Sequence, residues 1–107
     1  MRVAFFGDIV GKTGRQKLES SLHQYVSSEK IDFVVVNAEN ATSGAGLSAN
    51  HAEDLLNASV DCITLGDHAY DNKEIIPFLA RTKQIVRPIN YSDDCPGQGW
   101  QLSLIHI

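Results

Sequence analysis

Several residue types that mark particular classes of protein are scarce in this sequence of 107 residues. It has two cysteines, Cys62 and Cys95, without CxxC spacing, so we expect two inert thiols and no disulfide framework. No apolar run approaches the roughly 18 residues that a membrane span needs. The opening MRVAFFGD lacks the pattern of a signal peptide. We therefore expect a cytoplasmic protein that does not bind membranes.

Basic residues are too few for a broad nucleic-acid surface. The chain has 9 Lys and Arg against 13 Asp and Glu, which gives a formal net charge of −4. Broad electrostatic binding of nucleic acid depends on clustered basic side chains. A small anionic ligand can still bind where a metal ion supplies positive charge, so a small phosphate-containing substrate remains open.

The composition that is present describes one compact domain. Hydrophobic residues make up 43% and charged residues 21% of the chain, and its length suffices for one core but not for two. Short apolar runs recur along the sequence between helical patterns. These runs predict strands at 2–6, 31–37, 61–66 and 84–88, with a weaker fifth strand at 100–107.

The helices expected between these strands follow from apolar periodicity and from capping residues. Residues 14–28 carry an apolar stripe at helical spacing. Ser48 is a suitable N-cap for a second helix. Asp71 and Glu74 have the spacing of a capping box, which makes Asp71 a candidate helix cap. Pro77 would break a helix that began so early, so we expect the third helix to be kinked or to start late.

Alternating strands and helices predict an α/β fold with a mainly parallel sheet and flanking helices. Right-handed crossovers would connect successive strands, and we expect helices to cover both faces of the sheet. In such sheets, ligands bind beyond the carboxyl ends of the strands. We expect the crossovers to bring together the polar residues that follow the predicted strands, which are Asp8, Glu39, Asn40, Asp67 and His68.

These side chains have the chemistry of a site for divalent metal ions. Clustered carboxylates resist desolvation unless a cation lies among them. Oxygen ligands with a nearby imidazole suit manganese, ferrous iron or magnesium. Two ions about 3.5–4 Å apart can activate a water for attack on phosphorus, and Glu39 is our candidate for the carboxylate that bridges them.

The segment GDIVGKT raises an alternative, a P-loop-like nucleotide-binding protein. A P-loop has the spacing GxxxxGK, whereas only three residues separate Gly7 from Gly11 here. Asp8 would also place a carboxylate in a loop that binds anions. We therefore rank this alternative well below a metal site.

Four blocks of the sequence resemble the bacterial YmdB-like metallophosphoesterases, a family of 2′,3′-cyclic-nucleotide 2′-phosphodiesterases. The blocks are FFGDIVGKTGR, VVVNAENATSGAGLS, ITLGDHAYDNKE and VRPINY, in this order. The resemblance implies half of a calcineurin-like metallophosphoesterase sandwich. It also implies a metal-dependent phosphodiesterase that hydrolyses cyclic nucleotides or related phosphodiesters.

The resemblance further implies roles for individual residues. Asp8, Glu39 and Asn40 would bind one metal ion, and Glu39 would also reach a second. His68 would be the proton donor. The family's GNH block reads GDH here, so Asp67 offers an anion where the family has a neutral ligand; we expect it to bind the second ion tightly and lower its Lewis acidity. The implied cofactors are two divalent metal ions, iron or manganese before magnesium.

Family members continue beyond the length of this sequence and take further metal-binding histidines from that part. We therefore expect residues 1–107 to form a single incomplete metallophosphoesterase domain that is inactive or impaired, with about residues 100–107 outside the family pattern. A non-catalytic fragment or binding domain of the same fold is the alternative. An incomplete sheet would also favour association into homo-oligomers.

Other polar residues suit simpler roles. We expect Asn37 to form structural hydrogen bonds and Arg87 a structural salt bridge. His23 and His51 are expected to be solvated on helix surfaces. The SGAG segment at 43–46 could bind phosphate, although a flexible loop is the commoner case.

Overall fold

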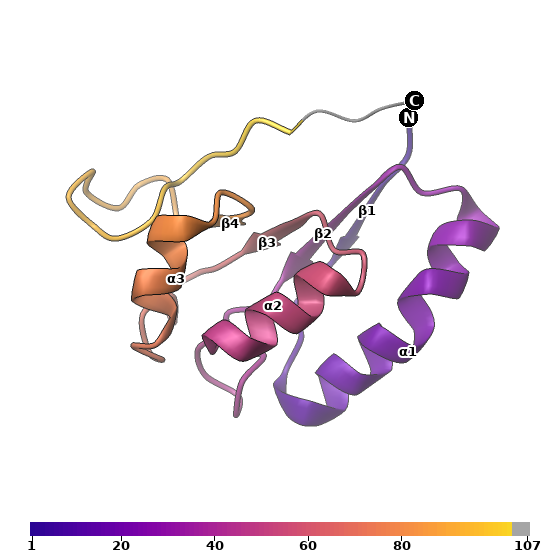
Figure 1. Ribbon diagram of the computed structural model, residues 1–107, viewed down its shortest axis with the longest axis horizontal. Coiled ribbons are helices and arrows are strands. Elements are labelled where there is room, and N and C mark those ends of the chain that lie inside the picture. Colours follow the sequence, from indigo (N-terminus) through magenta and orange to yellow (C-terminus); the bar gives the residue numbers. More distant parts are fainter. Residues whose placement is uncertain (104–107) are drawn as a thin grey trace.

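A parallel four-stranded sheet forms the centre of the computed structural model, which describes residues 1–103 (Figure 1). The strand order is β1-β2-β3-β4, and every neighbouring pair is parallel, which confirms the predicted fold class. The strands are shorter than the apolar runs that predicted them. Their bounds are β1 (Val3–Phe6), β2 (Phe33–Asn37), β3 (Cys62–Thr64) and β4 (Ile85–Val86).

The fifth strand expected at 100–107 does not form in its described part. Residues 100–103 have no regular secondary structure, and the rest of that segment lies outside the described residues. An isolated parallel bridge between Val86 and Gln98 adds one short contact at the β4 edge instead. One residue pair is too little to extend the sheet.

Within residues 1–103, three helices connect the strands, and all of them pack on the same side of the sheet (Figure 1). They are α1 (Gly11–Glu29), α2 (Ala49–Asn57) and α3 (Ile75–Arg81). The prediction that helices cover both faces is therefore wrong. Because the strand order follows the chain order, right-handed crossovers all pass over the same face. No helix within residues 1–103 is long and apolar enough to cross a membrane.

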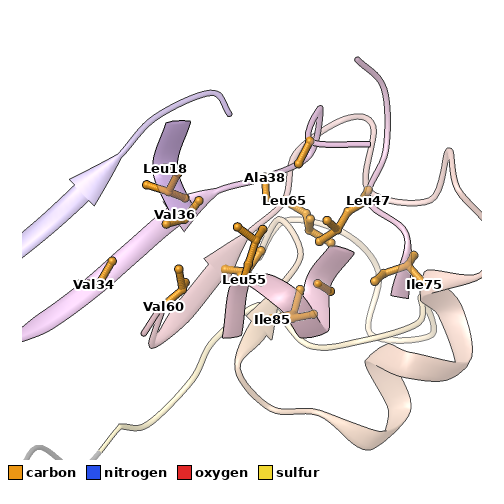
Figure 2. Close-up of a cluster of buried hydrophobic side chains, with 14 of the residues drawn as sticks. Leu18, Val34, Val36, Ala38, Leu47, Leu55, Val60, Leu65, Ile75 and Ile85 are labelled. Carbon is orange, nitrogen blue, oxygen red and sulfur yellow. The ribbon is translucent and has the colours of Figure 1, made fainter. Parts of the chain in front are cut away.

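One hydrophobic core lies between the sheet and these helices (Figure 2). Val34 and Val36 of β2 point into it, and Val36 is in register with Ile63 of β3. Ile63 is in turn in register with Ile85 of β4. The helices contribute core leucines such as Leu55. This core holds the strand ends in place.

The opposite face of the sheet carries apolar side chains that the described residues leave partly uncovered. Val3 and Phe5 on the edge strand β1 are 53% and 63% exposed. Their register partners on β2 are Phe33 and Val35, which are half-buried. The alternation of buried and exposed residues along β1 and β2 thus separates a core face from an accessible apolar face.

The helix starts agree in part with their predicted signals. The Ser48 hydroxyl accepts a hydrogen bond from the backbone N–H of His51 at 3.2 Å, which confirms Ser48 as the N-cap of α2. The third helix starts late, as Pro77 predicted, and Glu74 is its N-cap residue without a side-chain cap bond. The helix-cap role expected of Asp71 is wrong, because its carboxylate binds a different partner, described below.

Candidate functional site at the carboxyl edge of the sheet

The loops after β1, β2 and β3 lie side by side at the carboxyl edge of the sheet. Backbone hydrogen bonds join them: the Ile9 N–H donates to the Asn37 carbonyl at 3.1 Å, and the Gly11 N–H donates to the Asn40 carbonyl at 3.0 Å. The Ala38 N–H donates to the Thr64 carbonyl at 3.0 Å. The parallel sheet thereby brings the loops of three separate crossovers to one edge.

Asp8 and Asn40 meet at this edge although they are 32 residues apart in sequence. The Asn40 side-chain amide donates to Asp8 Oδ1 at 3.0 Å. Asp8 has a φ of 50°, in the left-handed region that costs most non-glycine residues about 1–3 kcal/mol. Aspartate tolerates this region better than most residues do, because its short side chain can form local hydrogen bonds. The turn after β1 thus directs the Asp8 carboxylate toward the loop after β2.

The Glu39 side chain is hydrogen-bonded to the loop after β3. Its Oε2 accepts a hydrogen bond from the backbone N–H of His68 at 3.2 Å, and its Oε1 accepts one from the Asn37 side-chain amide at 3.4 Å. Asn37 also donates to Thr64 Oγ1 at 3.4 Å, so its structural role is confirmed. Gly66 lies against the carboxylate so closely that a Cβ atom there would overlap both Glu39 oxygens. This role of Gly66 was not predicted, because the only signal for it in the sequence is its place after β3.

The His68 ring lies between two aspartates. Its Nδ1 is 2.7 Å from Asp71 Oδ2, and its Nε2 is 3.8 Å from Asp67 Oδ2. The hydrogen bond to Asp71, followed by the negative charge of Asp67, raises the pKa of His68 above its ordinary value of 6.5. Asp71 was not predicted as a partner of this histidine. The His–Asp spacing within one turn was the available signal, but a helix cap explained it equally well.

Four of the five predicted site residues therefore form two separate hydrogen-bonded pairs rather than one closed cluster. Asp8 contacts Asn40, and Glu39 contacts the backbone of His68. The Asp67 side chain is 86% exposed beside the His68 ring. Within residues 1–103, no three or more His, Cys, Asp and Glu side chains are grouped so that they could hold a metal ion.

The Asp8 and Asn40 pair nevertheless has a feature that fits a cation. Asn40 Oδ1 is buried and has no hydrogen-bond donor among the described residues. An unsatisfied buried acceptor costs about 1–3 kcal/mol, and coordination to a cation would remove that cost. Carboxylate and amide oxygens are the ligands that hard divalent cations prefer. The described residues thus fit part of a divalent cation site.

The SGAG segment borders this edge through its last glycine. Gly46 is buried with a φ of 83°, and a Cβ atom there would lie 2.8 Å from the backbone nitrogen of Asn72.

The prediction of a solvated His51 is wrong, because the half-buried ring of His51 forms a hydrogen bond between its Nδ1 and Thr42 Oγ1 at 2.8 Å. His23 is exposed, as expected.

Arg87 follows β4 at the same edge and is 5% exposed. The salt bridge expected for it does not form with any described residue. Its guanidinium instead donates to the backbone carbonyls of Pro88 at 3.0 Å and Ser92 at 3.3 Å. The Tyr91 hydroxyl donates to the Gly66 carbonyl at 3.2 Å, which joins this loop to the end of β3. Arg87 therefore organises the loop after β4.

The fold and the site define an α/β protein whose acidic, amide and imidazole groups gather beyond the carboxyl ends of parallel strands. The chain belongs to the YmdB-like family, because the sequence model of that family, described as YmdB-like protein, matches residues 4–106. The resemblance found in the four sequence blocks is thus confirmed.

Relatives in this family carry names of phosphate-ester hydrolases. The chain is 36% identical over 99 residues to the 2′,3′-cyclic-nucleotide 2′-phosphodiesterase of Bacillus subtilis (strain 168), covering 92% of this chain and 38% of the relative. It is 41% identical over 90 residues to a putative phosphatase/phosphodiesterase of Mycoplasma pneumoniae, covering 84% of this chain and 32% of the relative. These names support a phosphoesterase activity in the family.

Solved structures show the same fold. A hypothetical protein from Thermus thermophilus is 37% identical with a TM-score of 0.87, over 97% of this chain and 40% of that chain. A novel phosphatase from Mycoplasma pneumoniae is 40% identical with a TM-score of 0.83, over 91% of this chain and 36% of that chain. The chain thus spans less than half the length of the relatives that it matches.

Proposed function

We propose that this chain supplies metal ligands and the proton donor of a metal-dependent phosphodiesterase that acts on cyclic nucleotides or related phosphodiesters. The observation that carries the proposal is the Asp8 and Asn40 pair, whose buried amide oxygen lacks a donor within residues 1–103. The phosphodiesterase and phosphatase names of the relatives support the reaction class.

The ligand roles follow the positions of the side chains at the sheet edge. Asp8 and Asn40 would bind one divalent ion, and Glu39 would reach both that ion and a second one, to which Asp67 would contribute. Iron or manganese suits these ligands before magnesium. When bound, the ions would supply Lewis acidity toward the phosphoryl oxygens and positive charge against the charge that develops on them.

The remaining chemistry falls to His68. Opening a cyclic phosphodiester leaves an alkoxide oxygen that needs a proton, and His68 Nε2 is the ring nitrogen on the Asp67 side. The Glu39 carboxylate accepts a hydrogen bond from the backbone N–H of His68 and so fixes the loop that carries the ring. A positioned proton donor of this kind contributes typically ~10²- to 10⁴-fold in rate.

Manganese binding by the purified chain tests the ligand assignment. We expect Asp8→Ala and Asn40→Ala each to weaken Mn²⁺ binding by roughly tenfold or more, because each removes an oxygen donor. Asn57→Ala is the matched control, since Asn57 is an exposed residue at the end of α2. The Mn²⁺ affinity can be measured by isothermal titration calorimetry or by electron paramagnetic resonance of Mn²⁺. An affinity that is equal in the wild type and all three variants would remove the basis of the proposal.

A non-catalytic binding domain is the second candidate. It is favoured by the two separate pairs at the sheet edge. Hydrolysis of 2′,3′-cyclic AMP in the presence of Mn²⁺ separates the two candidates. We expect slow hydrolysis that His68→Ala lowers further while Mn²⁺ binding persists; metal binding without any hydrolysis would favour the binding domain.

A further inference from the structure

Asp71 has a contact that the proposed reaction does not yet explain. Its Oδ2 lies 2.7 Å from Nδ1 of His68, the distance of a strong charge-assisted hydrogen bond. The two side chains are 45% and 42% exposed, so their contact is not forced by burial in the core. The other ring nitrogen faces the opposite side, toward Asp67.

The backbone around Asp71 holds its carboxylate in this position. The Asp71 N–H donates to the His68 carbonyl at 3.2 Å, which closes a turn between the two residues. Gly46 packs against the turn, since a Cβ atom on it would lie 3.2 Å from the Asp71 Cβ. Just before α3, the Asn72 side chain, and not that of Asp71, accepts a hydrogen bond from the backbone N–H of Glu74 at 3.1 Å. Asp71 is thus free of a helix-capping role and directed at the ring.

We propose that Asp71 is a positioning residue that keeps a proton on Nδ1 of His68, so that Nε2 is the nitrogen that gives up its proton. This inference rests on the proposed function for its purpose, but its structural content can be measured without turnover. An unsupported imidazole can carry its proton on either nitrogen and can rotate about its side-chain bonds. A carboxylate on Nδ1 selects one tautomer and one ring orientation.

The proton balance of the donation step agrees with this role. In the charged ring both nitrogens carry protons; the Nε2–H bond breaks and an O–H bond forms on the departing alkoxide oxygen. The neutral ring that remains carries its proton on Nδ1, which is the tautomer that Asp71 stabilises. The water that attacks phosphorus releases a proton overall, and this proton restores the charged ring.

The ring nitrogens of His68 can be observed directly in the ¹⁵N-labelled chain. Long-range ¹H–¹⁵N correlation spectra, recorded where the ring is neutral, distinguish protonated from unprotonated nitrogens. We expect protonated Nδ1 in the wild type and a shift toward protonated Nε2 in Asp71→Ala. Asp93→Ala, which removes an exposed carboxylate from another loop, should leave the His68 signals unchanged. A wild-type ring protonated mainly on Nε2, or an Asp71→Ala spectrum equal to the wild type, would overturn the inference.

Kinetics of the metal-loaded protein supply the second readout. We expect Asp71→Ala to lower kcat by roughly 10- to 100-fold, the usual cost of losing an orienting partner, with KM nearly unchanged. Asp71→Asn keeps the side-chain size and should recover part of the loss. A rise in KM with unchanged kcat would instead mark Asp71 as a substrate contact. If the wild type hydrolyses nothing, the proposed function fails, while the NMR spectra still decide the position of the proton.

Discussion

Gly66→Ala tests how tightly the loop after β3 is built around Glu39. A Cβ atom at position 66 would overlap both carboxylate oxygens, so the Glu39 side chain must move. It would then lose the hydrogen bonds from the His68 N–H and the Asn37 amide. Hydrogen bonds to charged groups contribute about 1.5–3 kcal/mol each, and partial exposure of Glu39 places these two at the lower end.

The net effect includes a smaller opposing contribution from the unfolded chain. Replacing glycine by alanine restricts the unfolded chain and stabilises a protein by about 0.4–1 kcal/mol where φ is compatible. The backbone of Gly66 is not in the left-handed region, so this gain applies. We therefore expect Gly66→Ala to lower the free energy of unfolding by about 2 kcal/mol. Urea denaturation followed by circular dichroism measures this change.

Two comparisons show whether the Glu39 carboxylate is the cause. Gly7 directly follows β1, and a Cβ atom there would meet only Phe5 at 3.8 Å, so Gly7→Ala should be neutral or slightly stabilising. In a Glu39→Ala background, Gly66→Ala should lose most of its cost, giving a coupling energy of roughly 1–3 kcal/mol. An equal cost of Gly66→Ala with and without the carboxylate would refute the reasoning.

Three further predictions concern single side chains. Because its hydrogen bond with Asp71 raises the pKa of His68, Asp71→Asn should lower that pKa in an NMR titration. The stabilisation from the charged ring should be present below pH 6.5 and vanish as the pH rises through the raised pKa; an unchanged titration would contradict this cause. Ser48→Ala should lower the free energy of unfolding by about 1 kcal/mol, because it removes the N-cap hydrogen bond of α2, whereas Ser27→Ala at an exposed position should not lower it. Equal melting curves for the two variants would show that the Ser48 hydroxyl does not stabilise the helix. Arg87→Lys keeps the charge but loses the rigid, planar guanidinium whose two nitrogens bond the two loop carbonyls. About 1–2 kcal/mol of unfolding free energy should therefore be lost in thermal denaturation, and an unaltered melting temperature would show that this guanidinium geometry is dispensable.

Local patterns predicted most of the framework because they act over a few neighbouring residues. Apolar runs and helical periodicity gave the order of strands and helices, and the hydroxyl of Ser48 marked the start of α2. Pro77 correctly predicted a late third helix. The bounds were less accurate: α1 begins at Gly11, three residues before the predicted start at 14, because the turn after Asp8 feeds directly into the helix.

The sequence predicted where in the fold the candidate site lies, but only part of the contacts that its residues form. Parallel strands bring their carboxyl ends to one edge whatever the loops contain, so Asp8, Glu39 and His68 could be assigned there from sequence. Their partners depend on loop conformation. The left-handed turn at Asp8 and the close approach of Gly66 to Glu39 have no periodic signal.

By itself the sequence determined the α/β alternation, the N-cap of α2 and the polar residues that end each strand, because these depend on side-chain chemistry and short-range spacing. Tertiary structure alone decided that all three helices lie on one face, since that follows from the strand order. It also decided that Asp71 binds His68 instead of capping α3, and that Arg87 binds carbonyls instead of a carboxylate. In both cases several partners were chemically suitable, and the geometry of the folded loops selected one of them.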